Sequence, residues 1–225
     1  VNSTLACTVV AAKAGVRVAH VEAGLRSFDR AMPEEINRIV TDGLADLLFT
    51  TSADADENLL REGHPRDRIH LVGNTMIDTL LSNMDRLTKP AFFDELGLRP
   101  KSYFAMTMHR PANVDSGSTF TKLLDAIIAG TRGEPVVFPV HPRTAKTMRE
   151  FGALPASLKL VDPQPYLEFN YLVRHAKAVI TDSGGITEET TVMGVPCMTL
   201  RDNTERPETC EIGTNELLGT DPSAL

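Results

Sequence analysis

The sequence predicts an α/β protein made of parallel, doubly wound sheets. Short apolar runs, rich in valine, isoleucine and leucine, alternate along the chain with longer stretches that have the 3.6-residue periodicity of amphipathic helices. Polar, charged or glycine-rich segments follow directly after several of the apolar runs. Strand–helix alternation of this kind builds parallel sheets, and such sheets bind ligands at the carboxyl ends of their strands.

Eight apolar runs are the expected strands. In chain order they cover residues 16–21, 47–51, 69–72, 103–108, 136–140, 158–161, 178–181 and 197–200. The expected helices lie at about residues 34–45, 53–62, 75–87, 118–130, 144–151, 166–175 and 186–193, and a further helical stretch, residues 5–14, precedes the first strand. Each strand is thus expected to connect to the next through a crossover helix.

A domain boundary is expected near residue 73, where the segment Gly73-Asn74-Thr75 separates two series of strand–helix units. The first series, residues 1–72, holds fewer strands than the five or six of an ordinary sheet. We therefore expect residues 1–72 to be the C-terminal half of a Rossmann-like domain whose beginning is absent. Residues 73–225 are expected to form a second Rossmann-like domain.

Composition and charge narrow the range of functions. The 225 residues include 42% hydrophobic and 5% aromatic residues, with no tryptophan, and the formal net charge is −7. Nucleic-acid surfaces need clustered Lys and Arg and aromatic rings for stacking, so no nucleic-acid partner is expected. The sequence shows no apolar run of membrane-spanning length and no secretory leader, which predicts a soluble, cytoplasmic protein without a membrane partner.

The three cysteines, Cys7, Cys197 and Cys210, are widely spaced and form no C-x-x-C pair. An odd number of cysteines in this arrangement argues against a disulfide framework and against a zinc site. We therefore expect buried thiols and no zinc site.

The strongest binding motif follows the expected strand 178–181. Asp182 precedes Ser183, Gly184 and Gly185, which form a strand-to-helix turn. Two glycines there would let a phosphate approach backbone N–H groups at a helix N-terminus, where the helix dipole favours an anion. The alternative is a tight turn that Ser183 merely caps.

Two charged residues near this turn have both a functional and a structural interpretation. Glu189, one turn into the helix, could accept hydrogen bonds from the two hydroxyls of a ribose, or it could stabilise the first helical turn from the surface. Arg206 lies in a charged loop after the last expected strand, where it could bind a phosphate or form a surface ion pair with Glu205.

Histidine and arginine follow two further strands of the second domain. His109-Arg110 comes after residues 103–108, and His141 with Arg143 comes after residues 136–140. These side chains suit a diphosphate, although a histidine in such a place can also be a structural hydrogen-bonding residue.

Acidic side chains mark the first domain. Glu22 follows an expected strand directly, where burial in a crevice could tune its pKa for proton transfer. Glu34 and Glu35 follow Pro33 at the start of a helix, a position that also fits an ordinary helix start.

Taken together, these motifs resemble the non-hydrolysing UDP-N-acetylglucosamine 2-epimerases of bacteria and archaea. The segments that carry the resemblance, in order, are His20-Val21-Glu22-Ala23-Gly24-Leu25-Arg26, Pro33-Glu34-Glu35-Ile36-Asn37-Arg38, Gly73-Asn74-Thr75, His109-Arg110, Asp162-Pro163-Gln164, Asp182-Ser183-Gly184-Gly185 and Arg201-Asp202-Asn203-Thr204-Glu205-Arg206-Pro207-Glu208. The resemblance implies a two-domain fold of the glycosyltransferase-B type, with a UDP-sugar in the cleft. It implies no metal, no cofactor and a homodimeric intact enzyme.

The resemblance also assigns ligand contacts. Ser183, Gly184 and Gly185 are expected to hold the diphosphate, Arg206 and His109 to meet the phosphates, Glu189 to bind the ribose, and Gln164 and Phe169 to lie on the uridine side. Glu35, Arg110 and His141 resemble positions at which some bacterial members bind a second UDP-GlcNAc as an activator.

Members of the family interconvert UDP-GlcNAc and UDP-ManNAc. UDP leaves as a proton is lost from C2, which gives a 2-acetamidoglucal, and re-addition of UDP delivers a proton to the other face of the sugar. Glu22, Glu34 and His109 match catalytic positions, and Glu22 and His109 are also expected to contact substrate. The chemistry suits acidic side chains on opposite sides of the sugar, with cations that stabilise the departing UDP.

The sequence departs from the family pattern in two ways. His109-Arg110-Pro111-Ala112-Asn113 replaces the commoner His-Arg-Arg-Glu-Asn, and Val114-Asp115 resembles the archaeal and deep-branching members. An aspartate that serves in proton transfer would precede Val1, and the family's last helices would follow Leu225. We therefore expect a fragment with a complete UDP-binding half and little epimerase activity of its own.

Two other functions stay open from the sequence. A hydrolysing relative would release free ManNAc and UDP, and product analysis would identify it. A UDP-sugar binding or regulatory module would bind without turnover.

Overall fold

The computed structural model describes residues 2–109, 113, 117–140, 145, 148 and 154–221. The chain divides into two compact units, Val1–Asp78 and Thr79–Leu225. The division falls inside helix α4 (Thr75–Asn83), later in the chain than the boundary expected near residue 73. None of the helices in the described part of the chain is long and apolar enough to cross a membrane.

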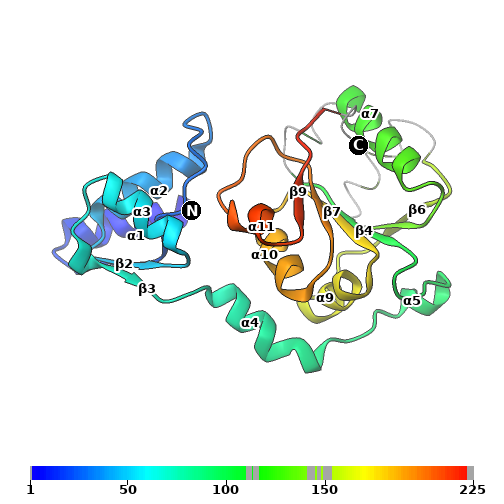
Figure 1. Ribbon diagram of the computed structural model, residues 1–225, viewed down its shortest axis with the longest axis horizontal. Coiled ribbons are helices and arrows are strands. Elements are labelled where there is room, and N and C mark those ends of the chain that lie inside the picture. The colour runs from blue at the N-terminus through cyan, green and yellow to red at the C-terminus, as the bar shows by residue number, and fades with distance from the viewer. Residues whose placement is uncertain are drawn as a thin grey trace. The chain divides into compact units, whose positions relative to one another are not determined.

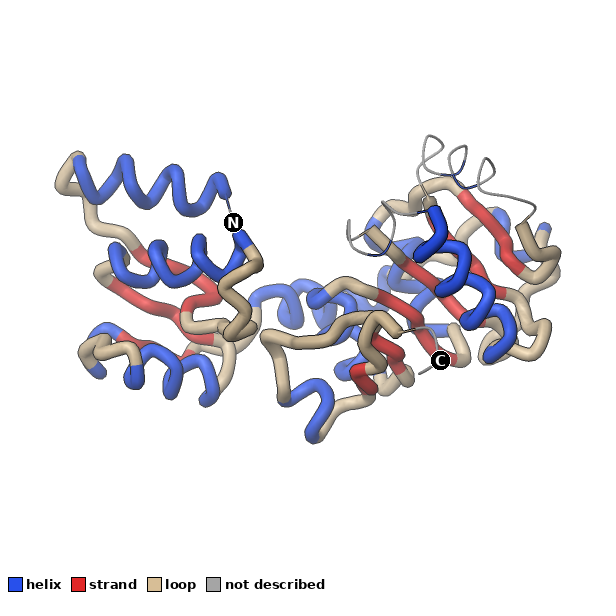
Figure 2. Tube along the Cα trace, turned by 90° about the horizontal axis from the view of Figure 1, so that it is seen from above, coloured by secondary structure: helices blue, strands red, loops and turns tan. Residues whose placement is uncertain are grey.

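The first unit is a three-stranded parallel sheet covered by helices. The strands β1 (Ala19–Ala23), β2 (Leu47–Thr50) and β3 (Ile69–Leu71) pair in the order β1-β2-β3. Figures 1 and 2 show α1 (Asn2–Lys13), α2 (Pro33–Leu44) and α3 (Ala53–Arg61) side by side on one face of this sheet, and a short 3-10 turn, η1 (Arg66–Arg68), precedes β3. Right-handed crossovers that all step in one direction place their helices on the same face.

The second unit is a six-stranded parallel sheet in the order β6-β5-β4-β7-β8-β9. Its strands are β4 (Phe104–Thr107), β5 (Val136–Pro139), β6 (Leu158–Val161), β7 (Ala178–Thr181), β8 (Cys197–Thr199) and β9 (Asn215–Leu217). Its helices are α5 (Phe92–Glu95), α7 (Gly117–Gly130), α9 (Tyr166–His175), α10 (Gly184–Met193) and α11 (Glu208–Glu211), and the 3-10 turn η2 (Met84–Arg86) follows α4.

Alternating side chains of β4 and of the residue before it, Tyr103, build a core on each face of this sheet. Phe104 and Met106 belong to one apolar cluster with the inner residues of α7, whereas Tyr103 and Ala105 belong to a second cluster with α9. Because successive strand residues point to opposite faces, one apolar strand supports two helical layers. Figure 1 shows α7 on one side of the sheet and α9 on the other.

The predicted α/β class with parallel sheets is confirmed. Each of the eight expected strands is present, and β7 has the predicted bounds, residues 178–181. The sequence missed β9, α5 and α11, which have three or four residues each and are too short for a clear periodicity. Most of the helix expected at 144–151 lies outside the described residues.

The cysteines differ in burial. Cys197 is buried, which raises the pKa of its thiol to about 11, and Cys210 is partly buried. The expectation of a buried thiol is wrong for Cys7, which lies exposed on α1.

Candidate functional site

The turn between β7 and α10 forms the centre of the candidate site. The strand is buried along its whole length, and Ser183 stands at the N-cap position of α10 in an extended conformation. The backbone N–H of Ser183 donates to Thr181 Oγ1 at 3.0 Å, which fixes the turn. Within the described structure the Ser183 side chain makes no capping bond to α10, so its hydroxyl can serve a ligand. The free N–H groups and the dipole of the helix favour an anion here.

Two buried arginines flank this helix N-terminus. A Cβ atom on Gly184 would lie 3.3 Å from Arg206 Nη1 and 3.4 Å from Arg201 Nη1. The glycine therefore leaves the space in which both guanidinium groups lie against the first turn of α10. Arginine is suited to phosphate because its planar fork donates two parallel hydrogen bonds.

Each arginine is held by a buried carboxylate. Arg206 Nε lies 2.6 Å from Glu188 Oε2, and Arg201 Nη1 donates to Glu205 Oε2 at 2.8 Å. The surface location considered from the sequence for an ion pair of Arg206 with Glu205 is wrong, because both side chains are buried. Glu205 bonds Arg201, and Arg206 lies against Glu188 of α10. Sequence reasoning also missed Arg201, although it belongs to the same charged loop.

Asp182 and His109 form a hydrogen-bonded pair beside the helix. The Asp182 carboxylate is fully buried and lies 2.7 Å from His109 Nδ1, while the His109 side chain is 63% exposed. It also accepts from the His109 backbone N–H at 3.0 Å and from Asn113 Nδ2 at 3.1 Å. A carboxylate only accepts, so Nδ1 carries the proton, and the ring is exposed enough for a ligand to reach it.

Glu189 is buried on the side of α10 that faces α9. Its carboxylate accepts a hydrogen bond from the Tyr166 hydroxyl at 3.0 Å, and burial raises the pKa of Glu189 in spite of the hydrogen bonds from Tyr166 and Asn170. Partial burial, together with the charge of Glu189, raises the pKa of Tyr166 to about 12. The surface-cap interpretation of Glu189 is therefore wrong, because this side chain is 5% exposed.

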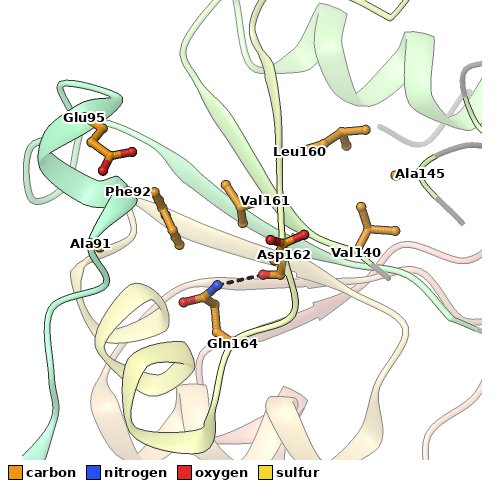
Figure 3. A pocket seen from close by; sticks show the side chains of 9 residues that line it. All are labelled: Ala91, Phe92, Glu95, Val140, Ala145, Leu160, Val161, Asp162 and Gln164. Carbon is orange, nitrogen blue, oxygen red and sulfur yellow. Dashed lines mark hydrogen bonds between the residues drawn. The ribbon is translucent and has the colours of Figure 1, made fainter. Parts of the chain in front are cut away.

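A cavity of about 590 Å³ opens at the carboxyl ends of β5 and β6 (Figure 3). The lining includes Phe92 of α5, Val140, Asp162 and Gln164, and Gln164 Nε2 donates to the backbone carbonyl of Asp162 at 2.7 Å. The cavity has the mixed apolar and polar lining that a planar base requires. Phe169 is not part of this lining and packs partly buried against the apolar cluster under α9.

In the first unit, Glu22 lies at an irregular point of β1. The register with β2 shifts between Val21 and Ala23, and Glu22 has a φ of 67° in the left-handed region, which is unfavourable for a residue with a side chain. Strain of this kind often marks a functional residue. Gly24 follows with a φ of 79°, and a Cβ there would lie 2.4 Å from the Ala55 carbonyl oxygen.

A buried charge network lies next to this strand end. Asp42 accepts from His20 Nδ1 at 2.5 Å, from Arg26 Nη2 at 2.7 Å and from the Gly24 backbone N–H at 3.1 Å. Burial tends to raise the pKa of Asp42, but the hydrogen bond from His20 and the charge of Arg26 outweigh it, so the pKa lies below its usual value. Arg26 also donates from Nε to Glu62 at 2.7 Å.

The two acidic residues at the start of α2 have different environments. Glu35 is buried, and its carboxylate accepts from the backbone N–H groups of Ser27 at 2.9 Å and Phe28 at 3.0 Å. Glu34 is exposed. The carboxylate of Glu35 thus holds the loop before α2, while Glu34 is the one that solvent reaches. Arg110 and His141, expected with Glu35 at a second ligand site, lie outside the described residues.

A family model described as UDP-N-acetylglucosamine 2-epimerase matches residues 1–225. The chain belongs to the UDP-N-acetylglucosamine 2-epimerase family. The family prediction from the sequence motifs is thereby confirmed.

Two relatives within the epimerase family are identical to this chain at about two fifths of the aligned positions. The UDP-N-acetylglucosamine 2-epimerase of Methanococcus maripaludis is 42% identical over 234 residues, which cover 100% of this chain and 64% of that protein. The UDP-2,3-diacetamido-2,3-dideoxy-D-glucuronate 2-epimerase of Pseudomonas aeruginosa is 41% identical over 222 residues, which cover 97% of this chain and 61% of that protein. The chain thus spans less than two thirds of the length of these relatives.

A solved structure of the family has the same fold. The crystal structure of the Methanocaldococcus jannaschii UDP-GlcNAc 2-epimerase in complex with UDP-GlcNAc and UDP matches with a TM-score of 0.89 at 43% identity, covering 100% of this chain and 64% of that one. The predicted pair of Rossmann-like domains of the glycosyltransferase-B type agrees with this match, and the fold class is confirmed.

Proposed function

We propose that this protein interconverts UDP-GlcNAc and UDP-ManNAc by epimerisation at C2, without hydrolysis of the sugar nucleotide. The observation that carries the proposal is the N-terminus of α10, where Ser183 and Gly184 adjoin two buried arginines and the exposed His109 imidazole. This set of donors is suited to the diphosphate of a nucleotide sugar.

The described residues of the second unit can bind UDP in three adjoining parts. The diphosphate fits the N-terminus of α10, the ribose hydroxyls fit the buried Glu189 carboxylate, and the base fits the cavity beside Gln164. Family membership supports this assignment, since the related archaeal enzyme was crystallised with UDP-GlcNAc and UDP.

The reaction needs a good leaving group and a base. As the bond between C1 and the phosphate oxygen breaks, negative charge grows on UDP, and Arg206 with protonated His109 would stabilise it. The C2 proton passes to a carboxylate, a role for which the family resemblance points to Glu22 and Glu34, and the product is a 2-acetamidoglucal. Addition of UDP across the same double bond, with a proton delivered to the opposite face of C2, completes the epimerisation.

A second substrate deserves a direct test, because the P. aeruginosa relative is named for a diacetamido-dideoxy-glucuronate and has nearly the same identity to this chain. That sugar carries a carboxylate at C6 and a second acetamido group at C3. The two substrates share the UDP moiety, so the described nucleotide-binding residues suit both.

The test is to incubate the full-length protein in D2O with UDP-GlcNAc or with the diacetamido-glucuronate nucleotide, and to follow C2 by NMR. We expect deuterium at C2 and formation of UDP-ManNAc from UDP-GlcNAc. Accumulation of free ManNAc would instead identify a hydrolysing enzyme. UDP binding without any exchange at C2 would identify a binding module, and preferential exchange in the uronate would reassign the substrate.

A further inference from the structure

Glu188 and Glu189 are neighbours in α10, but one has a cationic partner and the other has neutral partners. Glu188 lies 2.6 Å from Arg206 Nε, a cation, whereas Glu189 is bonded in the described structure by the neutral groups of Tyr166 and Asn170. A buried carboxylate that neutral donors alone support is energetically costly for the fold. A buried carboxylate of this kind, next to the expected nucleotide site, is suited to binding a ligand.

The groups that bond Glu189 come from one face of α9. Tyr166 and Asn170 are four residues apart in this helix, and residues at that spacing lie one above the other. The Tyr166 hydroxyl donates to Glu189 Oε1 at 3.0 Å, and Asn170 Nδ2 donates to the Tyr166 carbonyl oxygen at 3.2 Å. The first turn of α9 therefore holds the Glu189 side chain in one position.

The place of this pair suits a ribose. Glu189 is five residues beyond Gly184, which corresponds to about 7.5 Å along the axis of α10. Tyr166 follows Gln164, a residue of the cavity wall, by two positions. The pair thus lies between the expected places of the diphosphate and of the base.

We propose that Tyr166 is a positioning residue that orients Glu189 to accept hydrogen bonds from both ribose hydroxyls, so that the site selects ribonucleotides over 2′-deoxyribonucleotides. This inference rests on the proposed function as a UDP-sugar enzyme. A carboxylate has about four lone-pair sites, so one bond from the phenol leaves enough acceptors for the 2′- and 3′-hydroxyls. Loss of the 2′-hydroxyl would leave part of the buried carboxylate unsatisfied.

The experiment compares the affinities of UDP and 2′-deoxy-UDP by calorimetry. The wild-type protein is expected to prefer UDP by about tenfold or more, because a hydrogen bond to a buried charge is lost with the 2′-hydroxyl. In Tyr166→Phe we expect UDP to bind several-fold more weakly while 2′-deoxy-UDP changes little, so that the ratio of the two affinities falls towards one. Tyr166 is partly exposed and the change removes one oxygen atom, so the unfolding midpoint should stay near that of the wild type.

Two matched variants make the result decisive. Tyr171→Phe removes the hydroxyl of another tyrosine of α9, whose ring stacks on His175, and should leave the affinity ratio unchanged. Glu189→Gln removes the charge itself and should abolish the preference for UDP. An unchanged ratio in Tyr166→Phe, with the ratio lost in Glu189→Gln, would overturn the positioning role alone. An unchanged ratio in both variants, or no UDP binding by the wild type, would overturn the nucleotide assignment.

Discussion

The two units bury carboxylates in different ways. In the first unit Asp42 is bonded by a histidine and an arginine, and the pKa of its carboxyl is lowered. In the second unit Glu189 is bonded by a tyrosine and an asparagine, and its pKa is raised. The charge of a buried acid with cationic partners is compensated within the fold, whereas a buried acid with neutral partners retains acceptor capacity that a ligand can use. The partners of a buried acid, more than its burial, therefore distinguish a structural from a ligand-binding role.

The largest expected effect is on Asp42. Asp42→Asn removes the carboxylate that pairs with both His20 and the buried Arg26, and we expect the first unit to lose about 3–5 kcal/mol of unfolding free energy. Urea unfolding followed by circular dichroism would measure it. As a control, Glu57→Gln breaks the exposed pair with Arg61, which should cost at most about 0.5 kcal/mol. Equal losses in the two variants would contradict the structural role of the network.

A glycine-to-alanine change is expected to lower the stability of the first unit and to leave that of the second unit nearly unchanged. Gly24→Ala combines a positive φ with a 2.4 Å approach to the Ala55 carbonyl oxygen and should cost about 2–4 kcal/mol. Gly184→Ala meets only the ends of side chains, those of Arg206 at 3.3 Å, Arg201 at 3.4 Å and Glu205 at 3.8 Å, so it should leave the fold intact and weaken UDP binding. Thermal unfolding of both variants measures the loss of stability, and calorimetry measures the loss of UDP affinity. Equal losses of stability in the two variants would contradict the expected difference between the units.

Arg206→Ala tests the phosphate site. We expect UDP to bind about 1.5–3 kcal/mol more weakly, because a charge-assisted hydrogen bond is lost, while the affinity for uridine changes less. Calorimetry with both ligands gives the comparison. An equal loss of affinity for UDP and for uridine would contradict a contact with the diphosphate. It would show that the variant perturbs α10, because Glu188 has lost its arginine partner.

The last expected effect on stability concerns Glu189, whose replacement by glutamine should make the folded protein more stable. Because burial raises the pKa of Glu189, the folded chain holds this proton more tightly than the unfolded chain, and stability falls as the pH rises through the raised pKa. Glu189→Gln should therefore unfold at a higher temperature than the wild type at pH 7, and the difference should shrink at lower pH. UDP binding by the wild type should weaken as the pH falls through the same pKa. A lower unfolding midpoint of Glu189→Gln at pH 7 would contradict the interpretation.

The sequence predicted the binding turn because its signals are local. An apolar run followed by Ser183 and two glycines specifies a buried strand, a turn and a helix start within a few residues. The partners were harder to predict, because Tyr166 and Glu189 are 23 residues apart, and His109 and Asp182 are 73 apart. Their contacts depend on how helices and strands pack, and nothing in local composition encodes that packing. Strand β9 was missed because its three residues, Asn215–Leu217, include two polar ones.

The hydrogen bonds of Asp182 have a further consequence for how the site responds to charge. One buried carboxylate joins the end of β7 to the backbone and imidazole of His109, and Asn113 extends the connection to the Leu200 carbonyl oxygen after β8 at 3.4 Å. The imidazole and the start of α10 are thus oriented before any anion arrives. When negative charge grows on a bound phosphate, the surrounding dipoles need little reorientation, whereas water would have to rearrange around the same charge. The free-energy cost of orienting these groups is met when the second unit folds.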